Sequence, residues 1–187
     1  MDYRRRIATA FKELAVARGL HGVTMDELAA HAGLSKKTIY RHFRSKEEIV
    51  ALLVEELLQS VATRVQQALA LSDSPVDRVA HLIETVVRDV KPLAPLLLHD
   101  LQKYYPHLWE KIERFRAEKI QRTFEDLLRE DPQGCFRPVN PKIFTAALIA
   151  SVRAVVNPAF IMENNLSPEE TVRSLFAIFM YGVVADR

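Results

Sequence analysis

The sequence feature that most constrains the fold is the absence of glycine between Gly33 and Gly134. Tight hairpin turns need residues with positive φ, which glycine adopts at the lowest cost, so this stretch disfavours β-hairpins. Apolar residues instead recur at helical spacing, as in Ile49, Leu53 and Leu57. No strand pattern, internal repeat or low-complexity tract is present. The sequence therefore predicts an all-α fold of about nine helices.

Two short helices joined by a tight turn are predicted within TMDELAAHAGLSKKTIYRHFRSK, residues 24–46. Thr24 and Glu27 have the spacing of a capping box, which starts a helix, and Gly33 stands where a left-handed residue ends one. Ser35 then caps a second helix. A helix pair with this turn is a helix-turn-helix, whose second helix enters the major groove of DNA.

The second helix has an apolar side and a strongly polar side. Ile39 and Phe43 lie one turn apart and face a core. Lys36 and Lys37 follow the cap, where the helix dipole favours acids, so each forgoes about 0.3–1 kcal/mol. A polyanion outside the fold would compensate for this placement, although charge runs also occur as simple solvated faces. The side chains expected to turn outward are Lys36, Lys37, Thr38, Tyr40, Arg41 and His42.

Residues 24–50, TMDELAAHAGLSKKTIYRHFRSKEEIV, resemble the DNA-binding head of the tetracycline-repressor (TetR) family. The shared features are the threonine cap, the alanine pair, Gly33, Ser35, Thr38, the run from Tyr40 to Phe43, and Lys46 with the acids after it. The resemblance covers roughly the first quarter of the chain. Beyond it, only helical character, length and the segment GCFRPVNP are similar. Lys37 departs from the small residue often found there, so the family's base preference does not carry over.

The resemblance implies a DNA-binding transcriptional regulator, most often a repressor of a near-palindromic operator. By their chemistry, Tyr40, Lys46 and the helix start at Thr24 suit phosphate, whereas Lys37, Thr38 and Arg41 suit base edges. In the first helix, the arginines at positions 4–6 are either free to approach phosphate or simply solubilise the terminus. The predicted DNA-binding residues are Thr24, Ser35, Lys36, Lys37, Thr38, Tyr40, Arg41, His42 and Lys46.

The net charge of +2 hides a marked asymmetry. Residues 1–46 carry 10 lysines and arginines against 4 acids, and the remainder carries 16 against 20, so the two parts have net charges of +6 and −4. Phosphates would repel the acidic part, so double-stranded DNA should meet one end of the molecule. We therefore expect a DNA-binding domain at residues 1–46 and a larger helical domain for effector binding and dimerisation at residues 47–187.

The last predicted helix contains LFAIFMYGVV, residues 175–184, and is apolar on all sides. Such a helix must be covered on two sides, and a second copy is the simplest second cover. The last two helices therefore predict a two-fold, four-helix interface in a homodimer, with burial inside the monomer as the alternative. The predicted interface residues are Phe144, Leu148, Val152, Val155, Leu175, Phe176, Phe179, Met180 and Val183.

The resemblance also implies a small-molecule effector site in the larger domain. Its occupation would move the long helix that starts at Ser45 and so change the separation of the two heads. A small, largely apolar ligand is expected, because the apolar faces of this domain lack clustered charge. Aromatic and polar residues at helix breaks give the candidates His99, Tyr104, Trp109, Phe144 and Asn157.

Several other functional classes have little support in the sequence. The six histidines form no zinc motif, and there is no HExxH, phosphate loop or nucleophile elbow, so no metal, cofactor or catalysis is expected. No apolar run is long enough to span a bilayer, and the single cysteine fits a reducing compartment, so a cytoplasmic location is expected. An activator, an effector-independent architectural protein, or a metal sensor built around His99 and His107 remain as alternatives.

Overall fold

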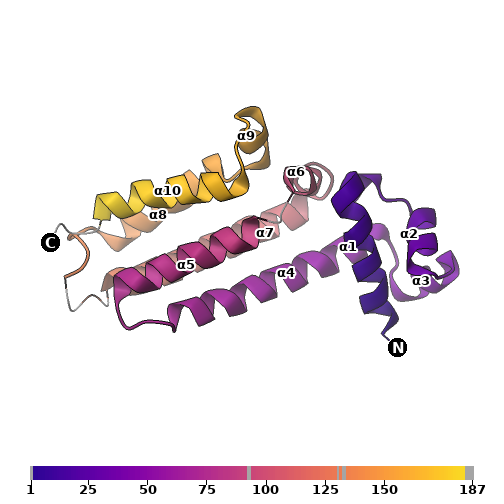
Figure 1. Ribbon diagram of the computed structural model, residues 1–187, viewed down its shortest axis with the longest axis horizontal. Helices are drawn as coiled ribbons and strands as arrows, with labels where there is room; N and C mark the ends of the chain where they lie inside the picture. Colours follow the sequence, from indigo (N-terminus) through magenta and orange to yellow (C-terminus); the bar gives the residue numbers. More distant parts are fainter. Residues whose placement is uncertain (1, 92–93, 130, 132–133, 184–187) are drawn as a thin grey trace.

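The computed structural model of the chain (Figure 1) describes all residues except 1, 92–93, 130, 132–133 and 184–187. Within these residues it consists of helices and has no strand, which confirms the all-α prediction. The elements are α1 (Tyr3–Gly22), α2 (Met25–Ala32), α3 (Lys36–His42), α4 (Lys46–Leu69), α5 (Pro75–Val90), α6 (Pro95–Tyr104), α7 (Pro106–Arg129), α8 (Pro141–Val155), α9 (Pro158–Glu163) and α10 (Pro168–Val183). The short α9 is the element that the sequence pattern did not predict. It forms because Asn157 caps it and Pro158 occupies its first turn.

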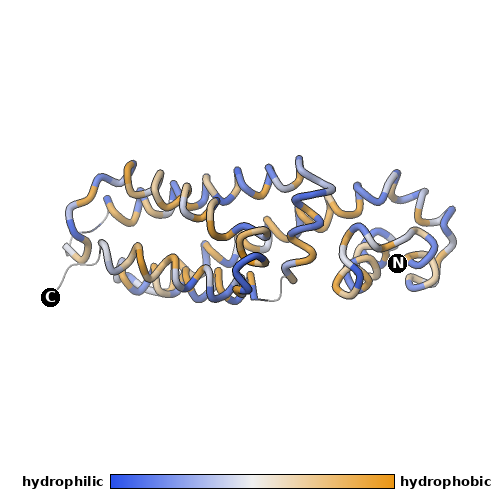
Figure 2. The backbone as a smooth tube through the Cα atoms, turned by 90° about the horizontal axis from the view of Figure 1, so that it is seen from above, coloured by the Kyte–Doolittle hydropathy of each residue, from blue (hydrophilic) through white to orange (hydrophobic). Residues whose placement is uncertain are grey.

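The helices form a head at one end of the molecule and an elongated body (Figure 1). The head consists of α1–α3. The 24-residue α4 leaves the head and runs along the body beside α5 and α7, over about 36 Å at 1.5 Å per residue. Figure 2 shows apolar and hydrophilic positions alternating along most helices, as expected of amphipathic helices. None of the helices in the described residues combines the length and apolarity needed to cross a membrane.

The core of the head continues into the body. Ile7, Phe11 and Leu28 of the head are completely buried and belong to the same apolar cluster as Ile49 of α4 and Leu101 of α6. A second apolar cluster fills the body. The head is therefore packed against the body helices rather than tethered to them by a linker.

The residues predicted to meet a second copy lie mostly inside the chain's own body cluster. Phe144, Leu148, Val152, Leu175 and Phe176 are buried in the monomer, so the prediction for these five residues is corrected. Val155, Phe179 and Met180 pack against the same cluster but are only partly buried, and their place in an interface stays a prediction. The side chain of Val183 lies outside the described residues. The correction arises because α8 turns its apolar side onto α7 and α10 turns its own onto α5.

The opposite faces of α8 and α10 carry three large apolar side chains that remain exposed. Ile143 is 70 % exposed, Ile178 is 69 % exposed and Tyr181 is 84 % exposed. We call this set the outer apolar face. It lies on the two helices that the sequence assigned to dimerisation, but on the side away from the monomer core.

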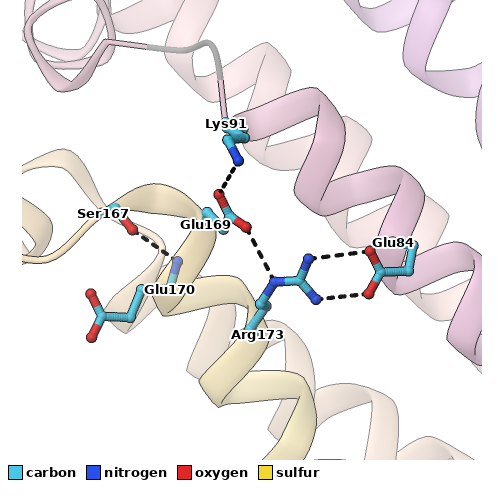
Figure 3. A network of polar contacts seen from close by, with 6 residues as sticks. All are labelled: Glu84, Lys91, Ser167, Glu169, Glu170 and Arg173. Atoms are coloured by element: carbon cyan, nitrogen blue, oxygen red, sulfur yellow. Dashed lines mark hydrogen bonds and ion pairs between the residues drawn. The ribbon is translucent and has the colours of Figure 1, made fainter.

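An ion-pair network fixes the start of α10 on α5 (Figure 3). Arg173 donates from Nη1 and Nη2 to both carboxylate oxygens of Glu84, at 2.7 and 3.2 Å. Its Nε lies 3.3 Å from Glu169, which also pairs with Lys91 at 3.2 Å. Exposed ion pairs contribute only about 0.2–1 kcal/mol each, so the value of this network lies in its bidentate geometry, which sets the rotation of α10.

Candidate nucleic-acid interface and ligand cavity

The turn between α2 and α3 has the caps that the sequence predicted. Thr24 Oγ1 accepts from the Glu27 N–H at 3.2 Å, and Glu27 Oε2 accepts from the Thr24 N–H at 3.1 Å. Gly33 ends α2 with φ 61° and ψ 40°, a left-handed conformation that strains any other residue. Ser35 Oγ accepts from the Thr38 N–H at 3.1 Å and so starts α3. These local bonds fix the angle at which α3 leaves the head.

The apolar side of α3 is fixed in the head, and much of its polar side is open to solvent. Ile39 and Phe43 are completely buried, as predicted. Lys37 and Arg41 are exposed and make no ion pair within the described residues, and Tyr40 is 50 % exposed. Two cations and a phenol on one short exposed helix can donate to phosphate oxygens and to base edges.

Two of the predicted DNA-binding lysines have partners within the chain. Lys36 Nζ lies 2.8 Å from Asp26 Oδ1, and this hydrogen bond raises the pKa of Lys36. Asp26 therefore supplies within the fold part of the compensation that the sequence analysis assigned to an outside polyanion for Lys36, whereas Lys37 has no ion pair in the described residues. Lys46 Nζ donates to the carbonyls of His21 at 2.8 Å and Val23 at 3.2 Å, and burial lowers its pKa. Lys46 thus ties the start of α4 to the end of α1, with one of its three N–H donors left over.

The end of α3 is held by α1, which differs from the expectation that His42 turns outward. The His42 ring is partly buried and stacks on Tyr3, with ring centroids 5.3 Å apart. The His42 carbonyl accepts from Arg4 Nη1 at 2.6 Å, and the Arg4 guanidinium lies 4.3 Å from the centroid of the Phe43 ring. Arg4 therefore positions α3, a role that the sequence analysis missed.

A second junction joins the head to α6. Asp100 is only 6 % exposed, and its Oδ2 accepts from the His21 N–H at 3.0 Å. Tyr104 stacks on the His21 ring with centroids 3.9 Å apart. At Gly19 the φ is 76°, and a Cβ there would collide with the Asp100 carboxylate. Gly19 interrupts the helical backbone with a kink, after which α1 continues to Gly22.

A cavity of about 170 Å³ lies in the body, enclosed mainly by α4, α5, α7, α8 and α10. Most of its wall is apolar, with Leu58 and Val61 from α4 and Phe176 from α10. Asp89, Arg116 and Lys119 also reach it, so charge is present where the sequence analysis expected none. A concave apolar site with a few polar groups is the usual form of a small-molecule site.

None of the five residues predicted to bind an effector lines this cavity, and the structure does not bring them together. His99 lies partly buried on α6, and Tyr104 stacks on the head. Trp109 packs against the head cluster, Phe144 contacts Phe124 in the body cluster, and Asn157 caps α9 by accepting from the Ala159 N–H at 2.9 Å. The prediction relied on helix breaks, but the cavity lies between the long helices.

Within the described part of the chain, no three histidine, cysteine, aspartate or glutamate side chains converge into a metal-binding group. Asp100 is hydrogen-bonded to the head, while His107 Nε2 lies 3.1 Å from Glu47. The residues that the metal-sensor alternative would need therefore point to separate partners.

Comparison with known proteins decides the family. A family model described as bacterial regulatory proteins, tetR family, matches residues 7–53, which form the head and the start of α4. The chain belongs to the TetR family. Over 165 residues this TetR-family protein is 25 % identical to YvaF of Bacillus subtilis, an uncharacterized HTH-type transcriptional regulator, covering 87 % of this chain and 86 % of YvaF. It is therefore a DNA-binding transcriptional regulator, as the resemblance of residues 24–50 predicted.

Two further comparisons extend the likeness of this TetR-family protein beyond its head. The transcriptional repressor KstR2 of Mycolicibacterium smegmatis is 34 % identical over 126 residues, which are 65 % of this chain and 61 % of KstR2. The crystal structure of a TetR/AcrR-family regulator from Thermobifida fusca superposes with a TM-score of 0.73 at 23 % identity, covering 97 % of this chain and 98 % of that chain. The fold is thus shared over nearly the whole length.

Proposed function

We propose that this TetR-family regulator is a homodimeric repressor, released from a near-palindromic operator when a small molecule occupies the body cavity. Residues 1–46 would bind DNA in the cytoplasm, and residues 47–187 would bind the effector and a second copy. The observation that carries the proposal is the exposed surface of Lys37, Tyr40 and Arg41 on a helix whose other side is locked by buried Ile39 and Phe43. The repressor KstR2, similar over part of the chain, supports the sign of regulation.

The outer apolar face supports the proposed dimer. Ile143 near the start of α8, and Ile178 and Tyr181 near the end of α10, present large apolar side chains to solvent. These two helix ends lie at the end of the body away from the head (Figure 1). Patches of this kind mark interaction sites in soluble proteins. Two copies joined across a two-fold axis would direct both α3 helices to one face of the DNA, with half-sites roughly 34–36 Å apart.

Two helices connect the cavity with the head and are our candidates for coupling. Leu58 and Val61 of α4 line the cavity, and the same helix begins at Lys46 on the carbonyls of α1. Leu98 of α6 lines the cavity, and Asp100 lies two residues later on the His21 N–H. A ligand can change DNA binding through these helices only if it prefers one arrangement of the heads over the other.

Selection of bound sequences from random duplex DNA tests the proposal. We expect a near-palindromic site, bound at least about 10³-fold more tightly than random duplex at physiological salt. An architectural protein would bind random duplex nearly as well, and an activator would raise rather than lower transcription from a promoter carrying the selected site.

Replacement of Lys37 tests the assignment of base contacts. Lys37→Ala should relax selectivity among variants of the selected site, because Lys37 is exposed and has no acceptor within the described residues. Arg122→Ala removes the same charge from the exposed side of α7 in the body, and should change nothing. An equal proportional loss on every duplex for Lys37→Ala would place this lysine on phosphate instead.

A further inference from the structure

One wall of the cavity differs from the others in its chemistry. Arg116, Lys119, Ile120 and Thr123 all line it from α7, and their spacing places them along one side of that helix. The facing walls, from α4, α8 and α10, contribute aliphatic residues and phenylalanine. The cavity therefore has an apolar interior and one cationic wall.

The acid that lines the cavity does not neutralise this wall. Asp89 is already paired with Arg64, whose Nε lies 2.8 Å from its Oδ1. Lys119 makes no ion pair within the described ranges, and its Nζ lies 5.6 Å from the centroid of the Phe115 ring. Lys119 is a partly buried residue of the cavity wall whose charge has no ion-pair partner in the described ranges, so the cavity favours a ligand that brings a negative charge.

Arg116 is also only partly satisfied. Its Nη1 donates to Glu113 Oε1 at 2.8 Å and to the Val156 carbonyl at 3.3 Å. Glu113 is shared with Arg153, whose Nε lies 3.6 Å away. The Nη2 and Nε donors of Arg116 have no hydrogen-bond acceptor in the part of the chain that the structure describes. A guanidinium with free donors fits the two oxygens of a carboxylate.

From this arrangement we infer that the cavity binds a carboxylate with an apolar tail, its anionic group between Arg116 and Lys119 and its tail among Leu58, Val61 and Phe176. The volume of about 170 Å³ sets the size of the tail. A protein cavity of about 150 Å³ takes up benzene, so a tail of about six to eight carbons fits. The inference rests on the ligand site of the proposed function and adds the chemical class of its ligand.

Three probes with the same tail test the inference: octanoate, 1-octanol and octyltrimethylammonium. Binding can be followed by the fluorescence of Trp109, the only tryptophan, because the Arg116 guanidinium lies 5.4 Å from the centroid of its ring. Calorimetry gives an independent dissociation constant. We expect octanoate to bind at least about tenfold more tightly than octanol, as for a hydrogen bond to a charged group, and the cation to bind most weakly.

A matched pair of variants locates the charge effect. Lys119→Met keeps the length of the side chain and should weaken octanoate at least about tenfold while leaving octanol unchanged or tighter. Lys111→Met removes the same charge from the same helix, where Lys111 pairs with Glu55 outside the cavity, and should leave both constants unchanged. Thermal unfolding of both variants verifies that they are folded.

Several results would overturn the inference. Equal affinities for octanoate and octanol would show that the ligand need not be anionic and would refute the inference. The cavity would still be a ligand site, so the proposed function would stand. The inference would also be refuted if neither octanoate nor octanol bound, or if Lys119→Met and Lys111→Met weakened the binding of octanoate equally. Operator binding needs no ligand, so its failure in the DNA selection is a separate result that refutes the proposed function instead.

Discussion

The junction between α1 and α6 yields a prediction whose size follows from the structure. Asp100 is buried, and its Oδ2 is the acceptor for the His21 N–H at 3.0 Å. Hydrogen bonds to a charged group contribute about 1.5–3 kcal/mol, and a buried donor left without an acceptor has a similar cost. We expect Asp100→Ala to lower the free energy of unfolding by about 2 kcal/mol. Asp100→Asn keeps an acceptor oxygen and should cost about half as much.

Urea denaturation followed by far-ultraviolet circular dichroism measures these changes, and thermal unfolding gives a second reading. At about 2–4 °C per kcal/mol for a chain of this size, Asp100→Ala should lower Tm by about 4–8 °C. Asp126→Ala, an exposed acid on α7, is the control and should stay within about 0.5 kcal/mol of the parent. If Asp100→Ala changed stability no more than this control, the hydrogen bond would not hold the junction. Equal losses for Asp100→Ala and Asp100→Asn would show that the charge near Lys46, rather than the acceptor, matters.

Two further predictions concern the head and the outer apolar face. The backbone N–H of Thr24, then its hydroxyl and Arg18, hold the pKa of Glu27 below its ordinary 4.5. Its contribution to stability is therefore complete above pH 4.5 and lost as the pH falls through the lower folded-state pKa, so Glu27→Gln should flatten the loss of stability below pH 4.5. The exposed Glu118→Gln should leave that acid profile unchanged, and an unaltered profile in Glu27→Gln would contradict the assignment. Ile178→Glu should give a monomer in sedimentation at micromolar concentration, whereas Leu71→Glu, equally exposed but at the α4–α5 connection, should remain a dimer. A dimeric Ile178→Glu would exclude the outer apolar face as the interface.

The features that the sequence predicted well depend on neighbouring residues. The capping box at Thr24, the left-handed Gly33 and the Ser35 cap each involve partners within four positions, so their chemistry is visible in the sequence itself. The burial of Ile39 and Phe43 followed from helical spacing for the same reason.

The features that the sequence did not predict depend on contacts between distant positions. Arg4 reaches His42 across 38 positions, and Asp100 reaches His21 across 79. Nothing in the local pattern distinguishes these side chains from solvated ones. The ion pair between Lys36 and Asp26 joins two helices, so the argument from the helix dipole at the start of α3 could not predict it.

The sequence also could not predict which apolar side of α10 faces the monomer core. The run around Phe176 is apolar on all sides, so it required two covers but did not show which side faced the monomer. The structure places Phe176 against the chain's own core and leaves Ile178 outside. The cavity was missed because its wall combines residues from several helices, among them Leu58, Arg116 and Val152, that only tertiary packing brings together.

Chemical footprinting on the selected DNA tests the central claim most directly, namely that two copies of α3 read one duplex from the same side. With the full chain bound, we expect two protected major-groove patches on one face, their centres about 10–10.5 base pairs apart. A single patch, protection confined to the minor groove, or two patches on opposite faces of the duplex would contradict the account.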